Sequence, residues 1–372
     1  MDKDFQLRKG QPDFMIMVIS LLLLGIGLVM IYSSSQIAAY DKFNDSSFFF
    51  KRQVVWAIAG IIAMIMVMNI PYTVYKKLTP LIILTLFILM VLVLTGLGST
   101  VNGAQRWLDL GFTKIQPSEF VKLGIIIYLA SIYSKKQEHI NNFSRGLIPP
   151  LVVVAIFFML ILLQRDLGTG MSVIFFTMVM IFCSGAQFKH LFGLGLVCSV
   201  IFFIFARTSP YRWQRITSFK DPWAEPLGSG YQLIQSLYAI GNGGVFGNGF
   251  GKSIQKYHYL PEAHTDFIFS ITAEELGLVG VLVILSLYLF FVLRGITISN
   301  RCPDLFGKLL AIGIVAMIGI QALINIAVVS GTLPVTGITL PFLSYGGSSL
   351  LLTMVAVGML LNISRYSHYE PD

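Results

Sequence analysis

The stretch from Lys256 to Ser270 combines ionisable side chains with apolar and aromatic residues. It contains a lysine, two histidines, a glutamate and Asp266, and it leads directly into an apolar segment long enough to cross a membrane. Ionisable groups at such a place are costly, so they usually have a function. A positioned carboxylate can take a proton from a hydroxyl group. We therefore predict that Asp266 is a catalytic base.

Asp266 also has a structural interpretation, because it directly precedes the predicted helix that starts at residue 267. An aspartate there can cap the helix and interact favourably with the helix dipole. Glu274 and Glu275 follow in the same segment and, being adjacent, point to different faces of a helix. We predict that one is solvated and that the other pairs with a basic group, both in structural roles.

Basic side chains gather around the start of the predicted helix at 118–134. They are Arg106, Lys114 and Lys122. Glu119 and Lys122 are three residues apart and share one helical face, so they can form an ion pair. Alternatively, Lys114 or Lys122 holds a phosphate together with Arg106, because a diphosphate needs cations whether it is bound or leaving.

Asp166 lies in a short turn between two apolar segments and is followed by Leu167, Gly168 and Thr169. Capping of the next helix is the favoured interpretation. Asp166 can also pair with a lysine or coordinate a divalent cation. The sequence patterns of zinc proteases, nucleophile-elbow hydrolases and phosphate-binding loops do not occur.

The elements that must position these residues are predicted to be transmembrane helices. Hydrophobic residues make up 55% of the chain and charged residues 12%, and the mean hydropathy is +0.77, whereas soluble domains carry about 25% charged residues. The apolar blocks have the length of roughly 17–25 residues that crosses a bilayer as a helix. We predict one domain, residues 1–372, with ten spans at about 13–33, 53–70, 79–97, 118–134, 147–163, 167–183, 188–206, 267–293, 308–330 and 343–364.

Lysines and arginines set the expected orientation. If the N-terminus is cytosolic, the inside segments carry thirteen of them and the short outside loops carry six. This excess predicts that the N- and C-termini are both cytosolic, because the number of spans is even. The net charge of +8 then reflects loops beside anionic membrane lipids, and no nucleic-acid partner is expected.

One long segment, residues 207–265, is expected to lie outside the cell between the seventh and eighth spans. Within it, Leu233, Leu237 and Ile240 recur at helical spacing, which predicts a short amphipathic helix on the membrane surface. The glycine-rich run Gly241–Gly251 ends this helix and is expected to let the backbone approach a ligand closely. An irregular hairpin loop is the alternative.

The last span is preceded by the irregular stretch Thr332–Pro341 and opens with Ser344–Ser349. Non-helical backbone near membrane depth is tolerated only where protein or water covers it. We expect this stretch to line a cavity wall, or else to form a loop ahead of a closely packed helix rich in small residues. The residues alone predict either a membrane-embedded transferase or a transporter.

Motifs over nearly the whole chain resemble those of the SEDS family (shape, elongation, division, sporulation), the peptidoglycan glycosyltransferases FtsW, RodA and SpoVE. The chain is most similar to the FtsW/SpoVE branch. The matching segments are Pro12–Phe14, Gln116–Phe120, Asp166–Thr169, Gly230–Ser236, Tyr259–Glu262, Thr265–Phe269, Glu274–Gly277, Pro334–Gly337 and Leu340–Ser349.

The resemblance implies an all-α polytopic membrane protein of the SEDS fold, which is similar to GT-C glycosyltransferases. Such a protein would polymerise lipid II into glycan strands at the outer face of the bacterial cytoplasmic membrane, in division or sporulation. It would act with a class B penicillin-binding protein, a transpeptidase. The essential aspartate of the family falls on Asp266, and its phosphate-binding basic pair falls on Lys114 and Lys122.

The other substrate-binding residues expected from this resemblance and from the charge pattern are Arg106, Glu119, Gln232, Glu262, His264 and Ser344. Glu262 and His264 are expected to tune the aspartate. A Mg²⁺ or Mn²⁺ ion is expected at the departing diphosphate, with Asp166 or Asp266 as its candidate ligand. Arg165 stands where the family usually has proline, and His258 stands where relatives differ, so it receives no catalytic role.

Two further classes of function fit the same ten spans. A lipid II flippase would also use an intramembrane lysine and broken helices, although the sequence shows no clear inverted repeat. A scaffold that recruits the transpeptidase is the third class, and it is compatible with catalysis.

Overall fold

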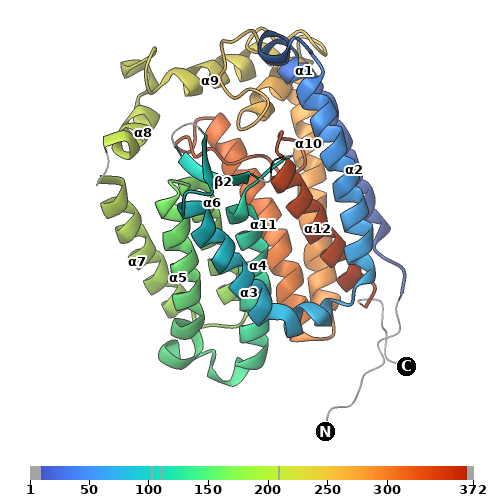
Figure 1. Ribbon diagram of the computed structural model, residues 1–372, viewed down its shortest axis with the longest axis vertical. Coiled ribbons are helices and arrows are strands. Elements are labelled where there is room, and N and C mark those ends of the chain that lie inside the picture. The colour runs from blue at the N-terminus through green and yellow to red at the C-terminus, as the bar shows by residue number, and fades with distance from the viewer. Residues whose placement is uncertain (1–9, 102–103, 110, 112, 208–209, 367–372) are drawn as a thin grey trace.

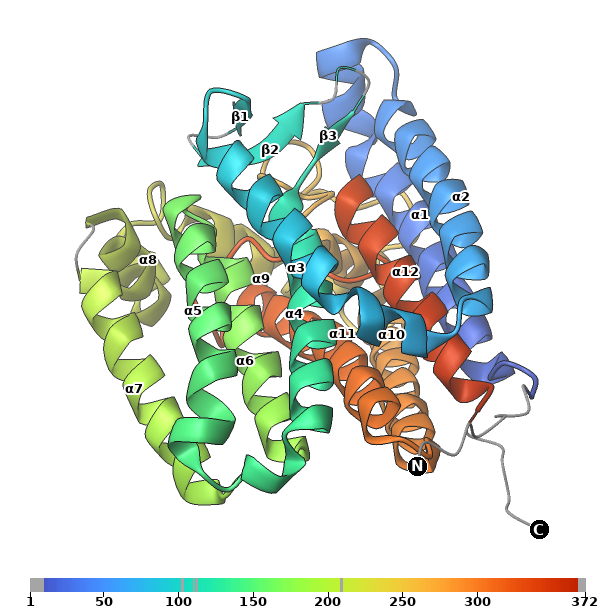
Figure 2. The ribbon, with the colours of Figure 1, turned by 60° about the horizontal axis from the view of Figure 1, so that its bottom comes forward.

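The computed structural model describes residues 10–101, 104–109, 111, 113–207 and 210–366. They form a bundle of helices with a small sheet near one end (Figures 1 and 2). The α-helices are α1 (Phe14–Phe43), α2 (Phe48–Asn69), α3 (Tyr72–Leu94), α4 (Pro117–Lys135), α5 (Ile148–Leu163), α6 (Leu167–Cys183), α7 (Phe188–Arg207), α8 (Pro210–Lys220), α9 (Tyr231–Gly243), α10 (Ile268–Arg301), α11 (Leu305–Val329) and α12 (Gly347–Ser364). Short 3-10 turns lie at Gln137–His139 and Pro222–Ala224, and a π-helical turn lies at Phe143–Leu147.

Every α-helix except α8 and α9 coincides with a predicted span, which confirms the all-α polytopic membrane fold. Among the described residues, seven helices are long and apolar enough to cross a membrane alone: α1, α2, α3, α5 with its π-helical turn, α10, α11 and α12. The apolar parts of α6 and α7 are shorter, and α4 carries charged side chains. Helix α1 runs beyond the predicted span to Phe43 and α3 begins earlier, at Tyr72, because helical backbone continues into polar residues.

The starts of α1 and the ends of α10 and α12 meet at one end of the bundle. The Asp13 carboxylate caps α1 by accepting from the Ile16 amide at 3.0 Å, and it also accepts from Arg294 Nε at 2.7 Å. The Asp13 amide donates to the Ser364 hydroxyl at 2.9 Å. The start of α1 and the end of α12 therefore lie on the same side of the bundle. The termini themselves lie outside the described residues, and their cytosolic location stays a prediction.

Two elements lie outside the predicted set. Strands β1 (Gly98–Val101), β2 (Ala104–Asp109) and β3 (Lys114–Ile115) form an antiparallel sheet between α3 and α4, with Leu108 opposite Ile115. Helix α8 begins at Pro210, and proline suits the first position of a helix. The 207–265 segment is thus not an irregular hairpin.

Helix α9 confirms the predicted short helix but buries a different face. Its buried residues include Leu233, Ile234, Ser236 and Ala239. The Ser236 hydroxyl donates to the Val329 carbonyl at 2.6 Å and lies 2.7 Å from the Ser270 hydroxyl. Helix α9 therefore packs on α10 and on the end of α11. Leu233, which was predicted to lie on the membrane surface, is buried in the protein, and Leu237 and Ile240 are half-buried.

Helix α10 is interrupted at Gly277, whose φ of 65° and ψ of −168° are not helical. The interruption removes the helical hydrogen bonds that would join residues 278 and 279 to residues 274 and 275. The glycine-rich segment 244–249 replaces them on both sides of the break. Its bonds are Asn248 N to Glu274 O (3.0 Å), Gly249 N to Glu275 O (3.0 Å), Leu278 N to Gly244 O (3.0 Å) and Val279 N to Val245 O (3.1 Å).

Two glycines of this run, Gly243 and Gly247, approach the protein backbone, while approach of the run to a ligand stays a prediction. A Cβ atom on Gly243 would lie 2.0 Å from the Ala273 carbonyl oxygen, and one on Gly247 would lie 2.2 Å from that of Glu275. Gly247 also has a φ of 77°, a conformation that side chains disfavour. Glycine is needed here because the loop inserts against the broken helix.

Buried charge holds the same loop in place. Glu275 is 1% exposed, accepts from the Ser33 hydroxyl of α1 at 2.6 Å, and pairs with Lys256 at 3.1 Å. The predicted pairing of one glutamate with a basic group is confirmed. The predicted solvation of the other is wrong, because Glu274 is fully buried and accepts from the Ser253 hydroxyl and the Ile254 amide. The loop covers α10 at these two glutamates and supplies the partners that water would otherwise provide.

We expect Gly277→Ala to lower the free energy of unfolding by about 2–4 kcal/mol, because a side chain is strained at this backbone conformation. The new Cβ would also lie 2.2 Å from the Gly247 nitrogen. The measurement is denaturant or thermal unfolding of the purified protein in detergent. Gly25→Ala is the matched control, since nothing lies within 4 Å of its Cβ on α1. Equal stability of the two variants would contradict this account of the break.

We expect Lys256→Met to lower the free energy of unfolding by about 3–5 kcal/mol, because it leaves the Glu275 carboxylate buried without its cation. The double variant Lys256→Met/Glu275→Gln should lose less than the sum of the two single variants, since it also removes the unpaired charge. Unfolding of the four proteins under one set of conditions measures this coupling. Additive losses would show that the ion pair contributes no coupling.

Candidate functional site

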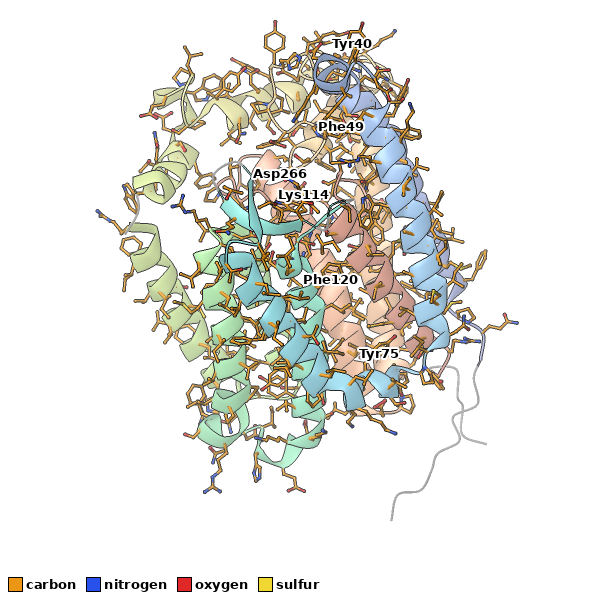
Figure 3. All side chains as sticks on the ribbon, viewed as in Figure 1. Tyr40, Phe49, Tyr75, Lys114, Phe120 and Asp266 are labelled. Atoms are coloured by element: carbon orange, nitrogen blue, oxygen red, sulfur yellow. The ribbon has the colours of Figure 1, made fainter. Side chains whose placement is uncertain are left out.

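The predicted catalytic residue lies at the end of the bundle opposite to Tyr75, as does Lys114 (Figure 3). Asp266 is partly exposed in the turn that precedes α10. The N-cap of α10 is Phe267, and no side chain caps the helix there. The interpretation of Asp266 as the helix cap is therefore wrong, because the helix begins one residue later than predicted.

The backbone around Asp266 is held by hydrogen bonds to three consecutive carbonyl groups, those of residues 264 to 266. The strap, residues 330–346 between α11 and α12, donates to two of them: the Tyr345 amide to His264 at 2.9 Å, and the Ser344 hydroxyl to Thr265 at 2.7 Å. The third carbonyl, that of Asp266 itself, accepts from Asn325 Nδ2 of α11 at 2.8 Å. The position of the Asp266 backbone is thus fixed from outside its own turn.

Ser344 helps to hold the backbone around Asp266 in place. Its hydroxyl also accepts from the Leu340 amide at 2.7 Å, and the residue is 5% exposed. Gln53 of α2 binds the same part of the strap, because its side-chain oxygen accepts from the Gly346 amide at 3.2 Å. The strap is non-helical backbone that protein covers, and Gly347 packs closely on Trp56 behind it. The predicted close packing is confirmed, and substrate binding by Ser344 stays a prediction.

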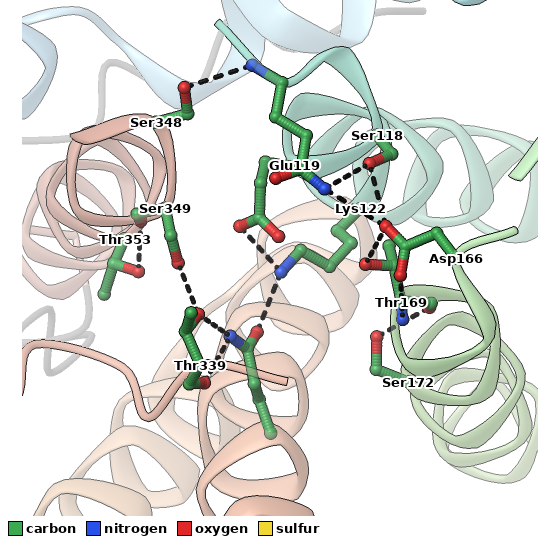
Figure 4. Close-up of polar contacts among 12 residues, drawn as sticks. Ser118, Glu119, Lys122, Asp166, Thr169, Ser172, Thr339, Ser348, Ser349 and Thr353 are labelled. Carbon is green, nitrogen blue, oxygen red and sulfur yellow. Dashed lines mark hydrogen bonds and ion pairs between the residues drawn. The ribbon is translucent and has the colours of Figure 1, made fainter. Parts of the chain in front are cut away.

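Glu119 and Lys122 form the predicted ion pair, 2.9 Å apart and buried inside the bundle (Figure 4). Lys122 Nζ also donates to Gln321 Oε1 of α11 at 2.9 Å. The lysine is 2% exposed. In this structure its ammonium group is committed to Glu119 and Gln321, so binding of a phosphate would require this arrangement to open.

Lys114 and Arg106 are the more accessible cations. Lys114 on β3 has a side chain that is 48% exposed, and it lies 3.9 Å from Asp109 on the neighbouring strand. Arg106 on β2 is 30% exposed and donates to the carbonyl groups of Gln164 (3.2 Å) and Arg165. The sheet thus presents two basic side chains near the turn between α5 and α6.

Asp166 caps α6, which confirms the favoured interpretation. Its carboxylate accepts from the Thr169 amide at 3.2 Å and from the Thr169 hydroxyl at 2.9 Å. It also accepts from Gln116 Nε2 at 3.1 Å and lies 3.4 Å from the Ser118 hydroxyl (Figure 4). Arg106 lies 4.0 Å from the same carboxylate. The cap therefore joins the starts of α4 and α6 beneath the sheet.

The two residues expected to tune Asp266 differ in their surroundings. His264 packs against Phe49 with the two rings tilted and their centroids 4.5 Å apart, and loss of hydration on burial lowers the pKa of its imidazole. The lowered pKa favours the neutral imidazole. Glu262 is exposed and accepts from the Thr265 hydroxyl at 2.8 Å, which stabilises the turn.

Gln232 and His258 lie apart from these contacts. Gln232 lines a small cavity between α8, α9 and the strap, together with Ser218, Ser229 and Val335. His258 is exposed and lies 2.6 Å from Asp41 at the end of α1. Substrate binding by Gln232 stays a prediction.

A resident metal site made of protein ligands alone does not fit the described part of the chain, which holds no group of three or more histidine, cysteine, aspartate or glutamate side chains arranged for a cation. The Asp166 oxygens face donors of the helix cap, not a cation. Mg²⁺ commonly binds through one or two carboxylates together with substrate phosphates. A divalent ion at Asp266 would therefore depend on the substrate for most of its ligands.

Three buried amide side chains around the strap were not predicted from the sequence. They are Gln321 and Asn325 on α11, and Gln53 on α2. Gln321 Nε2 donates to the Thr339 carbonyl at 3.0 Å, and Asn325 Nδ2 donates to that of Ile338 at 2.7 Å. The signal was present, since polar side chains inside an apolar span are expected to have partners. The partners could not be predicted because they are backbone groups of an irregular segment.

Comparisons with known proteins agree with this architecture. The family described as cell cycle protein FtsW/RodA/SpoVE matches residues 13–369. Stage V sporulation protein E of Bacillus subtilis (strain 168) is 51% identical over 363 residues, which cover 97% of this chain and 99% of that protein. The probable peptidoglycan glycosyltransferase FtsW of the same organism is 44% identical, with 97% and 92% covered.

Solved structures show the same fold. A chain of a peptidoglycan synthase complex, described as coordinating polymerization and crosslinking, is 30% identical and has a TM-score of 0.80, with 96% of this chain and 99% of that chain covered. The rod shape determining protein RodA of Thermus thermophilus is 27% identical and has a TM-score of 0.70, with 96% and 98% covered. By sequence over nearly its whole length and by fold, the chain belongs to the FtsW/RodA/SpoVE family.

Proposed function

We propose that this protein is a peptidoglycan glycosyltransferase that polymerises lipid II at the outer face of the bacterial cytoplasmic membrane, with Asp266 as the general base. The names of its FtsW relatives support the activity. The similarity to both a sporulation protein and FtsW proteins supports a role in division or sporulation. The N-terminus and C-terminus would face the cytosol, as the distribution of basic residues favours.

The observation that carries the proposal is that the acidic residues differ in their burial and in their bonding partners. Glu119, Asp166, Glu274 and Glu275 are buried in ion pairs, helix caps or loop contacts. Asp266 is partly exposed, and its backbone is held by Asn325 while the adjoining carbonyl groups are held by the strap. A base needs this combination of a fixed position and access to the acceptor hydroxyl.

The chemistry follows from these groups. The acceptor hydroxyl oxygen attacks the anomeric carbon of the donor sugar, and the bond from that carbon to the lipid diphosphate breaks with inversion from α to β. Asp266 takes the hydroxyl proton. The diphosphate leaves with the bonding electrons, and its added charge needs cations. Lys114 and Arg106 are accessible for this role, while Lys122 lies buried behind them.

A divalent cation, Mg²⁺ or Mn²⁺, would neutralise the diphosphate further when it is bound. Of the two candidate ligands, Asp166 is occupied by the cap of α6, so Asp266 is the one that we retain. The residues present do not form a protein-only site. The ion would accompany the substrate, and no step of the proposed reaction depends on it.

The outer loop supports a protein partner. Between α9 and α10 it exposes Val245, Phe246, Phe250, Ile254 and Tyr257, of which Phe246 is 82% exposed. In a loop outside the bilayer, where we place this segment, an exposed apolar surface suits contact with another protein. We propose a class B penicillin-binding protein as that partner, because the similar chain in the solved complex coordinates polymerization with crosslinking.

Asp266→Ala and Asp266→Asn should each reduce lipid II polymerisation by about 10²–10⁴-fold, the usual contribution of a general base. The assay combines purified full-length protein, a cognate class B penicillin-binding protein, labelled lipid II and Mg²⁺ or Mn²⁺, and it reads glycan products on a gel. Asp45→Asn is the matched control, because Asp45 is an exposed outer carboxylate paired with Lys51.

Polymer made at the wild-type rate by both Asp266 variants would refute the base assignment. No polymer from the wild-type complex, together with lipid II crossing liposome bilayers, would refute the transferase and support the flippase. Wild-type polymer that vanishes only with the Asp266 substitutions is the expected result.

A further inference from the structure

Two amide side chains on α11 connect the two charged parts of the site. Gln321 and Asn325 are one helical turn apart and therefore lie on one face. Both are almost fully buried, at 4% and 1% exposure. Gln321 reaches Lys122 with its oxygen, and Asn325 reaches the Asp266 carbonyl with its nitrogen. The cation and the proposed base are thus tied to the same turn of one helix.

The same two amides also bind adjacent residues of the strap. Gln321 Nε2 donates to the Thr339 carbonyl at 3.0 Å, and Asn325 Nδ2 donates to the Ile338 carbonyl at 2.7 Å. Thr339 continues the chain of polar contacts to Ser349 of α12 at 3.2 Å (Figure 4). The amides therefore join α11, the strap and the turn before α10 where the strap passes Asp266.

The strap passes close to the Asp266 side chain at Gly337. This glycine has a φ of 74°, and a Cβ atom built on it would lie 3.4 Å from Asp266 Oδ2. Movement of the strap by a fraction of an ångström would therefore change the space around the carboxylate. The hydrogen bonds of Asn325 to Ile338 and to Asp266 fix the strap and the base relative to each other.

The orientation of the Asn325 amide is set by chemistry. Its nitrogen faces two carbonyl oxygens, which only a donor can satisfy. Its oxygen is buried and accepts no hydrogen bond from the described residues. A leucine of similar size would avoid this unpaired acceptor, so packing alone does not account for an amide at this place. The need to hold the carbonyl groups of Asp266 and Ile338 does account for the amide.

We propose that Asn325 is a positioning residue for the transfer reaction, which sets the place of Asp266 by holding the carbonyl groups of Asp266 and Ile338 together. The inference rests on the proposed function. Gln321 acts one turn away in the same manner on the strap and on Lys122. Neither amide touches the substrate, so their loss affects the reaction rate more than substrate binding.

The test uses Asn325→Leu and Asn325→Asp in the full-length protein with its transpeptidase partner. Leucine removes both donors with an apolar group of similar volume, and aspartate removes them with unchanged shape. Each variant should lower the maximal polymerisation rate at least 10-fold, while the lipid II concentration at half-maximal rate changes less than 3-fold. Hydrogen exchange of the amides at 264–268 and 337–340 should become faster, and that at 253–256 should not change.

Asn362→Leu is the matched control. Asn362 is a fully buried asparagine on α12, and its nitrogen donates to the Met68 carbonyl at 2.7 Å while its oxygen accepts from the Tyr72 amide at 2.8 Å. It belongs to the other end of the bundle. Asn362→Leu should lower the melting temperature by an amount similar to Asn325→Leu and keep the maximal rate within 2-fold per folded molecule.

A wild-type maximal rate in both Asn325 variants would overturn the inference. A loss of rate in Asn362→Leu as large as that in the Asn325 variants would also overturn it, since the effect would then be general destabilisation. If the wild-type complex makes no polymer, the proposed function fails. The inference is then judged by hydrogen exchange alone, where an unchanged rate at 264–268 in both variants would refute it.

Discussion

The break in α10 at Gly277 is the constraint on which the end of the bundle that carries Asp266 depends. A helix that breaks inside a membrane protein leaves backbone groups that must find partners. Here the glycine-rich segment 244–249 supplies them on both sides of the break. Insertion of that segment brings Ser253 and Lys256 over the buried glutamates. The short first part of α10 is thereby held at a fixed angle, with Asp266 at its start.

The polar residues inside the bundle fall into two groups with different physical roles. Charged groups that are fully buried have partners, because an unpaired charge there would be very unfavourable. Lys122 and Glu275 are in ion pairs, and Glu274 accepts hydrogen bonds from Ser253 and Ile254. Amide and hydroxyl groups, among them Asn325 and Ser344, bind the carbonyl groups of irregular backbone. The first group keeps helices together, and the second places the turn that carries Asp266.

The sequence allowed the helical spans, the cap at Asp166 and the ion pair of Glu119 with Lys122 to be predicted, because hydrophobic periodicity and local spacing determine them. It did not allow the sheet at 98–115 or the contact between the glycine-rich run and α10 to be predicted. The strands of the sheet are only two to six residues long, too short for a clear alternation of polar and apolar residues. The contact with α10 was missed because it joins segments that are separated in the chain. The same reason hid Asn325, whose partners lie on two irregular segments.

The central claim is that this arrangement presents the Asp266 carboxylate to the acceptor hydroxyl while outer cations face the diphosphate. The most direct measurement is a structure of the Asp266→Asn variant, with its transpeptidase partner, bound to lipid II. The account predicts that the amide of the substituted residue lies about 2.6–3.2 Å from the acceptor hydroxyl and that Lys114 or Arg106 contacts the diphosphate. An acceptor sugar bound away from residue 266, or a diphosphate that contacts neither cation, would contradict it.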